Sequence, residues 1–136
     1  MRLVFRQFPL ESHPHALAAA KASVCAAKQG RFWEVHGALF AAPSLSEDVL
    51  RGAASSAGLD AAAFDACRAS DATLAAVMKD RQTGKRIGVT GTPTYVVNGV
   101  VLSGAVGFEQ LQSAVLNELK NAAPARASLQ ERDGKP

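Results

Sequence analysis

The spacing of apolar residues changes twice along the chain. Residues 2–10 are mostly apolar and β-prone, and they predict a strand. Residues 15–87 place apolar side chains at helical spacing, and Gly30 and Gly58 interrupt the pattern. Beyond this block the pattern changes to short β-branched runs and then to a last helix. The order strand, helical block, hairpin and helix predicts an α/β domain rather than a helix bundle.

Helix start signals divide the helical block. Ser44-x-x-Glu47 has the pattern of a capping box, in which a hydroxyl and a carboxylate satisfy two free amides at the start of a helix. Asp60 and Asp71 are expected to cap the next two helices, because a short carboxylate accepts from the first free amides. The first two helices of the block are expected over residues 15–29 and 31–41.

The last third of the chain carries a hairpin signal. Thr94–Val97 and Val100–Ser103 are short β-branched runs separated by Asn98-Gly99. A two-residue hairpin turn needs positive φ at both positions, which Asn and Gly accept readily. Residues 121–136 show no period and are expected to form a disordered tail. Between hairpin and tail a helix is expected, with an apolar face made of Phe108, Leu111, Val115 and Leu119.

Composition and charge narrow the classes of function. Of the 136 residues, 48% are hydrophobic and 20% are charged, which is ordinary for a globular domain. The net charge of +3 is scattered, so no nucleic-acid surface is expected. No apolar run is long enough to span a membrane, and residues 1–10 lack the pattern of a signal peptide. No metal site is expected, because His13 and His15 form only a loose pair and His36 is distant in sequence.

Aromatic residues gather in the second expected helix. Phe32, Trp33, Leu39 and Phe40 could line a peptide groove. An aromatic stripe at helical spacing more often belongs to the core, and the core is the interpretation we favour. By the same argument His36 is expected to be a packed or partly exposed side chain rather than a catalytic base.

The chain has two cysteines, Cys25 and Cys67, and they do not form a Cys-x-x-Cys motif. Each lies late in an expected helix, away from the helix N-termini and cations that activate a thiol. Neither is therefore expected to be a catalytic nucleophile. The residues alone leave two alternatives open, which are separate buried thiols and a structural disulfide.

Several segments in a fixed order point to one protein family. Val4–Leu10 is followed by an Ala-rich helix, then by Gln29–Trp33, and later by Gly88–Thr94 leading to Val97–Gly99. In this order and spacing they resemble the DsbA-like thiol–disulfide oxidoreductases over about residues 2–120. The resemblance implies an α/β, thioredoxin-like fold with a large α-helical insertion.

The resemblance also implies how the chain is divided. Residues 1–120 would form the DsbA-like thioredoxin-fold domain, with a strand over 2–10 and the helical insertion over 15–87. Residues 88–120 would hold the cis-proline loop, the hairpin and the C-terminal helix, and the tail over 121–136 would follow. In the family, a first strand and a helix that opens with Cys-x-x-Cys precede the position of this strand. We therefore expect an N-terminally truncated fold.

The resemblance assigns substrate binding to Thr92 and Pro93. In the thioredoxin-like fold the bond before this proline is cis, and the threonine backbone faces outward to pair with an extended substrate. The implied substrates are extended or unfolded proteins with thiols, the implied activity is disulfide formation or exchange, and no cofactor is implied. No catalytic residue is assigned, so we expect an inactive oxidoreductase domain. The alternative is a non-catalytic peptide- or protein-binding module that retains this loop.

The resemblance bears further on the cysteines, the assembly and the compartment. Some DsbA-like proteins carry a second, non-catalytic disulfide at comparable positions, which favours a Cys25–Cys67 bridge in an oxidising compartment. An absent central strand would leave two open sheet edges, so a strand-exchanged homodimer is expected. The family is mostly periplasmic or exported, whereas this chain shows no signal peptide, so the compartment stays open.

Overall fold

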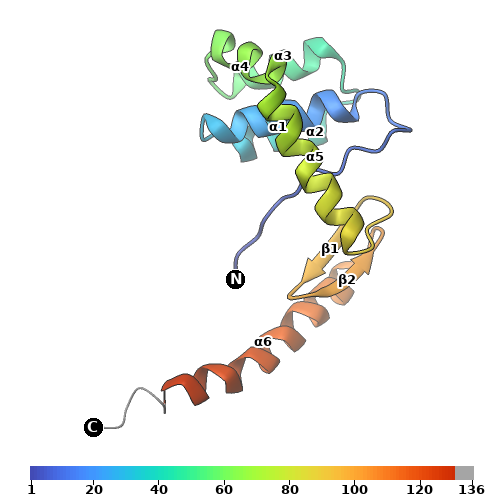
Figure 1. Cartoon of the computed structure of the whole chain (residues 1–136), viewed down its shortest axis with the longest axis vertical. Coiled ribbons are helices and arrows are strands. Elements are labelled where there is room, and N and C mark those ends of the chain that lie inside the picture. The colour runs from blue at the N-terminus through green and yellow to red at the C-terminus, as the bar shows by residue number, and fades with distance from the viewer. Residues whose placement is uncertain (131–136) are drawn as a thin grey trace. The chain divides into compact units, whose positions relative to one another are not determined.

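The computed structural model describes residues 1–130, with side chains described as far as residue 121. This part of the chain forms two compact units, divided between Gly88 and Val89. The first unit contains α1 to α5, and the second contains β1, β2 and α6 (Figure 1). The helices are α1 (Ala16–Lys28), α2 (Phe32–Ala41), α3 (Glu47–Ser56), α4 (Ala61–Ala69), α5 (Asp71–Arg86) and α6 (Phe108–Gln130), and the strands are β1 (Thr94–Val97) and β2 (Val100–Ser103).

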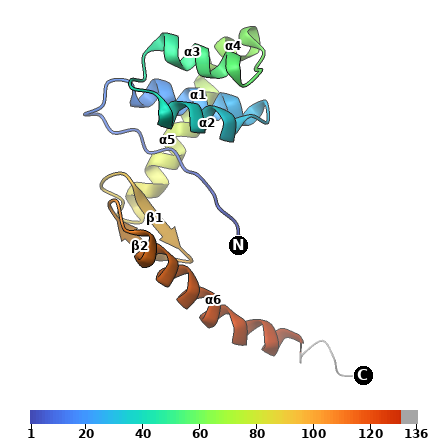
Figure 2. The same cartoon turned by 180° about the vertical axis from the view of Figure 1, so that it is seen from behind.

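Helix α1 lies at the centre of the first unit, where it contacts α2, α3, α4 and α5 (Figures 1 and 2). Its inner face carries small residues such as Ala22 and Ala26, both fully buried, so the neighbouring helices can pack closely against it. Larger side chains from the other helices fill the remaining core, among them Leu50 of α3 and Phe64 of α4. Burying each of these side chains stabilises the fold by about 1.5–3 kcal/mol.

Asp60 caps α4, as predicted. Its Oδ1 accepts a hydrogen bond from the Ala63 amide at 2.7 Å, which satisfies one of the free donors at the start of the helix. Gln29, at the end of α1, exchanges two hydrogen bonds with the Asp60 backbone, at 2.9 and 3.3 Å. The start of α4 is therefore tied to the end of α1.

Two other predicted caps are wrong by one or two residues. The predicted capping box at Ser44 does not form, because Ser46 is the N-cap of α3 and its side chain accepts from the Val49 amide. The predicted cap at Asp71 is also wrong, since Ser70 is the N-cap of α5. In both places the capping residue has extended backbone angles directly before the first helical residue, which is what the cap geometry requires.

Residues 2–10 have no regular secondary structure, so the predicted strand is wrong. A strand needs a hydrogen-bonded neighbour, and within residues 1–130 only β1 and β2 pair with each other. The segment is held instead by Asp80 of α5, which accepts from the Gln7 amide and from the Arg6 guanidinium, both at 3.1 Å. Gln7 is 8% exposed, so this contact anchors the segment to the helical unit.

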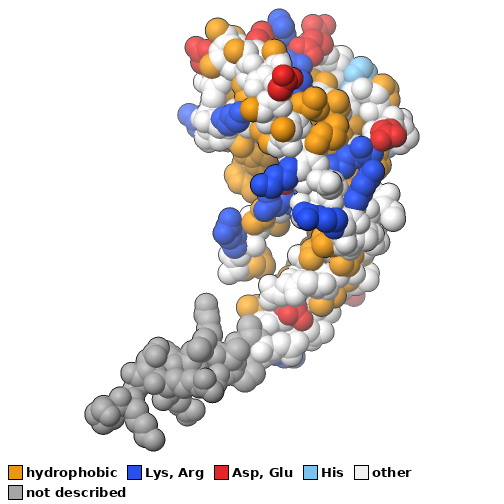
Figure 3. Space-filling view, viewed as in Figure 1, with side chains coloured by type: hydrophobic (Ala, Val, Ile, Leu, Met, Phe, Trp, Pro, Cys, Tyr) orange, Lys and Arg blue, Asp and Glu red, His pale blue; other side chains and the backbone are white. Residues whose placement is uncertain are grey.

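The aromatic residues of α2 are less buried than predicted. Leu39 belongs to the core, but Trp33 is 53% and Phe40 is 76% exposed, and Phe32 is half-buried. The prediction that this stripe is core is therefore wrong for the aromatic rings, because α2 turns a different face to α1. His36 is half-buried, as expected, with its ring 4.4 Å from the Phe40 ring. Figure 3 shows hydrophobic side chains at the surface of the first unit among charged ones.

The hairpin of the second unit has the predicted bounds. β1 and β2 are antiparallel, with Thr94 opposite Ser103 and Val97 opposite Val100. The turn residues Asn98 and Gly99 have φ values of 48° and 100°, which confirms the turn chemistry expected from the Asn-Gly pair.

Helix α6 is longer than predicted. It continues to Gln130, so the prediction of a disordered tail from residue 121 is wrong for residues 121–130, and the rest of the predicted tail, 131–136, lies outside the described residues. The extension is rich in alanine, which has the highest helix propensity. Within the described residues, no helix has the length and apolar character that crossing a bilayer requires.

Candidate functional site

The Thr92–Pro93 loop lies at the start of the hairpin in the second unit. The Thr92–Pro93 peptide bond is cis, and both residues are exposed. The loop is fixed on both sides, because the Thr94 hydroxyl donates to the Gly91 carbonyl at 2.7 Å and the Pro93 carbonyl accepts from the Gly104 amide at 2.9 Å. The loop is therefore held at the same end of the hairpin at which β2 finishes.

The backbone of Thr92 is available for pairing. Within the described part of the chain, no hydrogen bond engages its amide or its carbonyl. The neighbouring strand β1 pairs with β2 along one edge, and no other described strand pairs with its second edge. An exposed strand edge with unsatisfied groups is a template for an added strand. An extended polypeptide can therefore pair with the backbone here.

The two cysteines lie in the first unit and form a disulfide. Cys25, near the end of α1, is fully buried, and Cys67, near the end of α4, is half-buried. The bridge joins the central helix of the unit to α4 across a sequence separation of 42. The structure therefore contains the pair that the family resemblance favoured, rather than two separate thiols.

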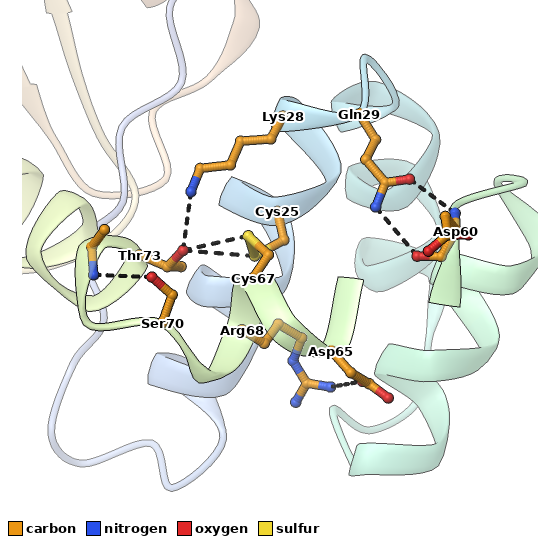
Figure 4. Close-up of a disulfide and its surroundings, with 10 residues drawn as sticks. Cys25, Lys28, Gln29, Asp60, Asp65, Cys67, Arg68, Ser70 and Thr73 are labelled. Atoms are coloured by element: carbon orange, nitrogen blue, oxygen red, sulfur yellow. Dashed lines mark hydrogen bonds and ion pairs between the residues drawn. A yellow bond between two sulfur atoms is a disulfide. The ribbon is translucent and has the colours of Figure 1, made fainter. Parts of the chain in front are cut away.

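A buried hydroxyl faces the disulfide. Thr73, fully buried in the first turn of α5, places its Oγ1 3.4 Å from Cys67 Sγ and 3.9 Å from Cys25 Sγ (Figure 4). The ammonium group of Lys28, one turn beyond Cys25 on α1, donates to the same Oγ1 at 3.3 Å. The contacts of Thr73 could not be predicted from the sequence, because α5 and α1 come together only in the folded unit.

An ion-pair network is centred on Arg68, the residue after Cys67. The guanidinium of Arg68 donates to both carboxylate oxygens of Glu47 at 2.6 Å, and it lies 3.8 Å from a carboxylate oxygen of Asp65. These hydrogen bonds from Arg68, followed by its charge, lower the pKa of Glu47 to about 2. Arg68 therefore pairs with carboxylates of α3 and of its own helix α4. The cation that contacts Thr73 is Lys28.

The predicted site residues belong to two different units of the chain. Cys25 and Cys67 are bonded to each other in the first unit, whereas Thr92 and Pro93 form an exposed loop in the second. Sequence reasoning missed Thr73. The spacing of Cys25 and Lys28, three residues apart on one helix, was the available signal for a cation near the bridge.

The chain is similar to one known protein family and to several known proteins. Residues 2–116 match the family described as DSBA-like thioredoxin domain. The chain is 35% identical over 128 residues to the Na(+)/H(+) antiporter NhaA 3 of Salinispora tropica, a match that covers 90% of this chain and 19% of that protein. It is 43% identical over 101 residues to the antiporter NhaA 1 of Mycolicibacterium gilvum, covering 71% of this chain and 16% of that protein. The chain thus spans less than a fifth of these relatives.

This chain covers a larger share of two solved structures. A thioredoxin-like oxidoreductase from Silicibacter pomeroyi superposes with a TM-score of 0.79 at 28% identity, covering 87% of this chain and 68% of that one. The thiol-disulfide exchange protein alpha-DsbA2 from Wolbachia pipientis superposes with a TM-score of 0.73 at 22% identity, covering 85% and 64%. At this lower identity the second likeness concerns the fold alone.

Proposed function

Since the chain belongs to the DSBA-like thioredoxin domain family, we propose that it positions extended, thiol-containing polypeptides for thiol–disulfide exchange. The observation that carries the proposal is the exposed Thr92 backbone, which has no hydrogen-bond partner within the described residues and continues into the open edge of β1. A substrate strand would pair with these groups, and main-chain pairing accepts many sequences.

Pro93 would serve this role by fixing the backbone. A residue before proline is restricted to extended conformations, so Thr92 keeps its amide and carbonyl in a strand-like arrangement. Proline also has no N–H of its own, so the substrate would meet a defined pattern of donors and acceptors. The loop would not select particular substrate side chains, which suits a domain that receives many unfolded proteins.

Exchange at this loop also requires a thiolate. In thiol–disulfide exchange a thiolate attacks a disulfide sulfur and a mixed disulfide forms. The 136 residues contain Cys25 and Cys67 as their only cysteines, and these two are bonded to each other, so neither is a free thiolate. We therefore propose that these residues alone bind at the loop without catalysing exchange there. Insulin reduction by the 136-residue chain faster than the uncatalysed background, and lost on Pro93→Ala, would contradict this.

The alternative is a binding module without turnover. It rests on the same open backbone. For thiol–disulfide exchange a thiolate from outside these residues would have to reach the bound substrate, and in the binding module none does. Cation transport, which the names of the antiporter relatives state, is not part of the proposal, because the match covers less than a fifth of those proteins.

Peptide affinity tests the proposal. A fluorescent, extended peptide in which serine replaces the single cysteine is titrated with the chain. Binding is followed by fluorescence anisotropy. Pro93→Ala is expected to weaken binding about tenfold or more, because Thr92 loses its backbone restriction. Pro43→Ala, at an exposed proline of the first unit, is the matched control and is expected to bind like the original chain. Equal affinity for both variants would contradict a role for the loop.

The strand-exchanged homodimer stays a prediction for the isolated chain. The open edge of β1 and the extended segment 2–10 are the features that could pair between two copies. Light scattering at micromolar concentration would give twice the chain mass if they do. A monomer mass, with slow amide exchange in both segments, would contradict the dimer.

A further inference from the structure

The geometry points to the Cys25–Cys67 disulfide as a thiol-exchange site of its own, at which thiols of peptides or small molecules attack the sulfur of Cys67. This inference does not depend on the proposed role of the Thr92–Pro93 loop, since the bridge and its contacts all lie within the first unit. It rests on the direction of the hydrogen bonds around Thr73 and on the unequal burial of the two cysteine residues.

The hydrogen bonds around Thr73 are directed at the sulfurs. Lys28 has only donors, so the Thr73 oxygen accepts from the ammonium group at 3.3 Å. The sulfurs of a disulfide carry no proton, so the Thr73 hydroxyl is the donor in the contact of 3.4 Å with Cys67 and in the longer one with Cys25. The result is a relay from ammonium to hydroxyl to sulfur (Figure 4).

Such a relay suits a thiolate better than a disulfide. A disulfide sulfur is a weak acceptor, whereas a hydrogen bond to an ionised acceptor is about twice as strong as a neutral one. The cation behind the hydroxyl polarises it further toward the sulfur. Thr73 also lies in the first turn of α5, a helix of 16 residues whose N-terminus carries partial positive charge. These groups together favour the ionised form of Cys67, which the position of that residue in its own helix did not predict.

The two cysteines differ in exposure. Cys25 is 0% exposed, and Cys67 is half-buried. An incoming thiolate is therefore expected to attack at Cys67, the cysteine that is partly exposed. Thr73 is also nearer to Cys67, by 3.4 against 3.9 Å, so the partly exposed cysteine is the one with the shorter hydrogen bond.

The atoms and electrons of the exchange balance between the disulfide and two substrate thiols, without a further reagent. A first substrate thiolate attacks Cys67 Sγ, a substrate–Cys67 disulfide forms, and Cys25 leaves with the electron pair of the broken bond and takes up a proton. A second substrate thiolate then attacks the substrate sulfur, and Cys67 leaves as a thiolate that accepts from Thr73. Two substrate thiols are oxidised to one disulfide, and the bridge is reduced by two electrons.

Reduced glutathione is the probe that tests the site on the complete chain. The oxidised chain is mixed with excess glutathione, free thiols are alkylated, and the peptides are mapped by mass spectrometry. The expected intermediate carries glutathione on Cys67 and the alkyl group on Cys25. Glutathione on Cys25, or no reaction unless denaturant is added, would overturn the proposal and leave the bridge as a structural one.

Substitutions at the relay test its role as a positioning device. The equilibrium constant for reduction by glutathione is measured at about pH 9, where a thiol of ordinary pKa near 8.5 is largely ionised. Thr73→Val is expected to lower the constant about tenfold, since it removes a hydrogen bond to a charged acceptor, and Thr73→Ser is expected to restore it. Lys28→Met is expected to lower it about threefold and Lys28→Arg to restore it.

The control is Lys21→Met, which removes the same charge about two turns earlier on α1 and is expected to leave the constant unchanged. Thr73→Val could lower the constant through a loss of packing alone. Restoration of the constant in Thr73→Ser and Lys28→Arg would show that the hydrogen bonds of the relay are responsible. An unchanged constant in Thr73→Val, or equal losses in the Lys21 and Lys28 variants, would overturn the relay.

Discussion

Removing the Cys25–Cys67 bridge is expected to destabilise the helical unit by about 4 kcal/mol. The bridge closes a loop with a sequence separation of 42 between α1 and α4, and the loop-entropy relation gives this value for a loop of that length. A domain is stable by only about 5–15 kcal/mol, so the loss is a large part of the total. The double variant Cys25→Ala, Cys67→Ala is the perturbation.

Three samples distinguish the stability that comes from the bridge from the stability that comes from packing of the cysteine side chains. Urea unfolding, followed by circular dichroism, compares the oxidised chain, the reduced chain and the double alanine variant. The oxidised and reduced chains differ in the bridge alone, so the 4 kcal/mol belongs to that pair. The alanine variant adds the loss of packing at Cys25, which is fully buried. A difference of less than about 1 kcal/mol between the oxidised and reduced chains would refute the stabilisation expected from the lower entropy of the bridged unfolded chain.

Three further substitutions test the packing, the ion pairs and the N-terminal segment. Phe64→Ala should cost about 3–5 kcal/mol in urea unfolding, because the ring is 2% exposed within the core of the helical unit; a loss below 1 kcal/mol would contradict that burial. The pKa of Glu47 is about 2 in the folded chain against an ordinary 4.5, so its contribution is full above pH 4.5 and is lost as the pH falls toward 2. Because Glu47 is 52% exposed we expect about 0.5–1 kcal/mol, and Glu47→Gln should remove that pH dependence. Asp80→Ala should speed hydrogen exchange at the Gln7 amide severalfold, since Asp80 accepts from it; unchanged exchange would show that the segment is held elsewhere.

Local chemistry explains which elements were predictable from the sequence. The hairpin bounds and turn were predicted in full, because Asn98 and Gly99 carry the required backbone angles within the turn itself. Asp60 was found as a cap for the same reason, since its acceptor and the amide it meets are three residues apart. The Ser44 cap failed although it fits a local pattern, because Ser46 stands nearer to the true start of the helix and competes for the same role.

Properties that depend on distant partners could not be predicted in this way. A strand over residues 2–10 requires a neighbouring strand, and the apolar pattern alone cannot supply one. The exposure of Trp33 and Phe40 depends on which face α2 turns toward α1, and an aromatic stripe has the same spacing on either face. The contact of Thr73 with the two cysteines joins three helices, so no single window of sequence contains it.

Backbone NMR of the isotope-labelled chain tests whether the Thr92–Pro93 loop receives an extended polypeptide. Adding an unlabelled extended peptide is predicted to shift the amide resonances of Gly91, Thr92 and Thr94 and of the β1 edge, and to protect the Thr92 amide from exchange with solvent. Binding that shifts only resonances of α1 to α5, or no shift at millimolar peptide, would contradict the account.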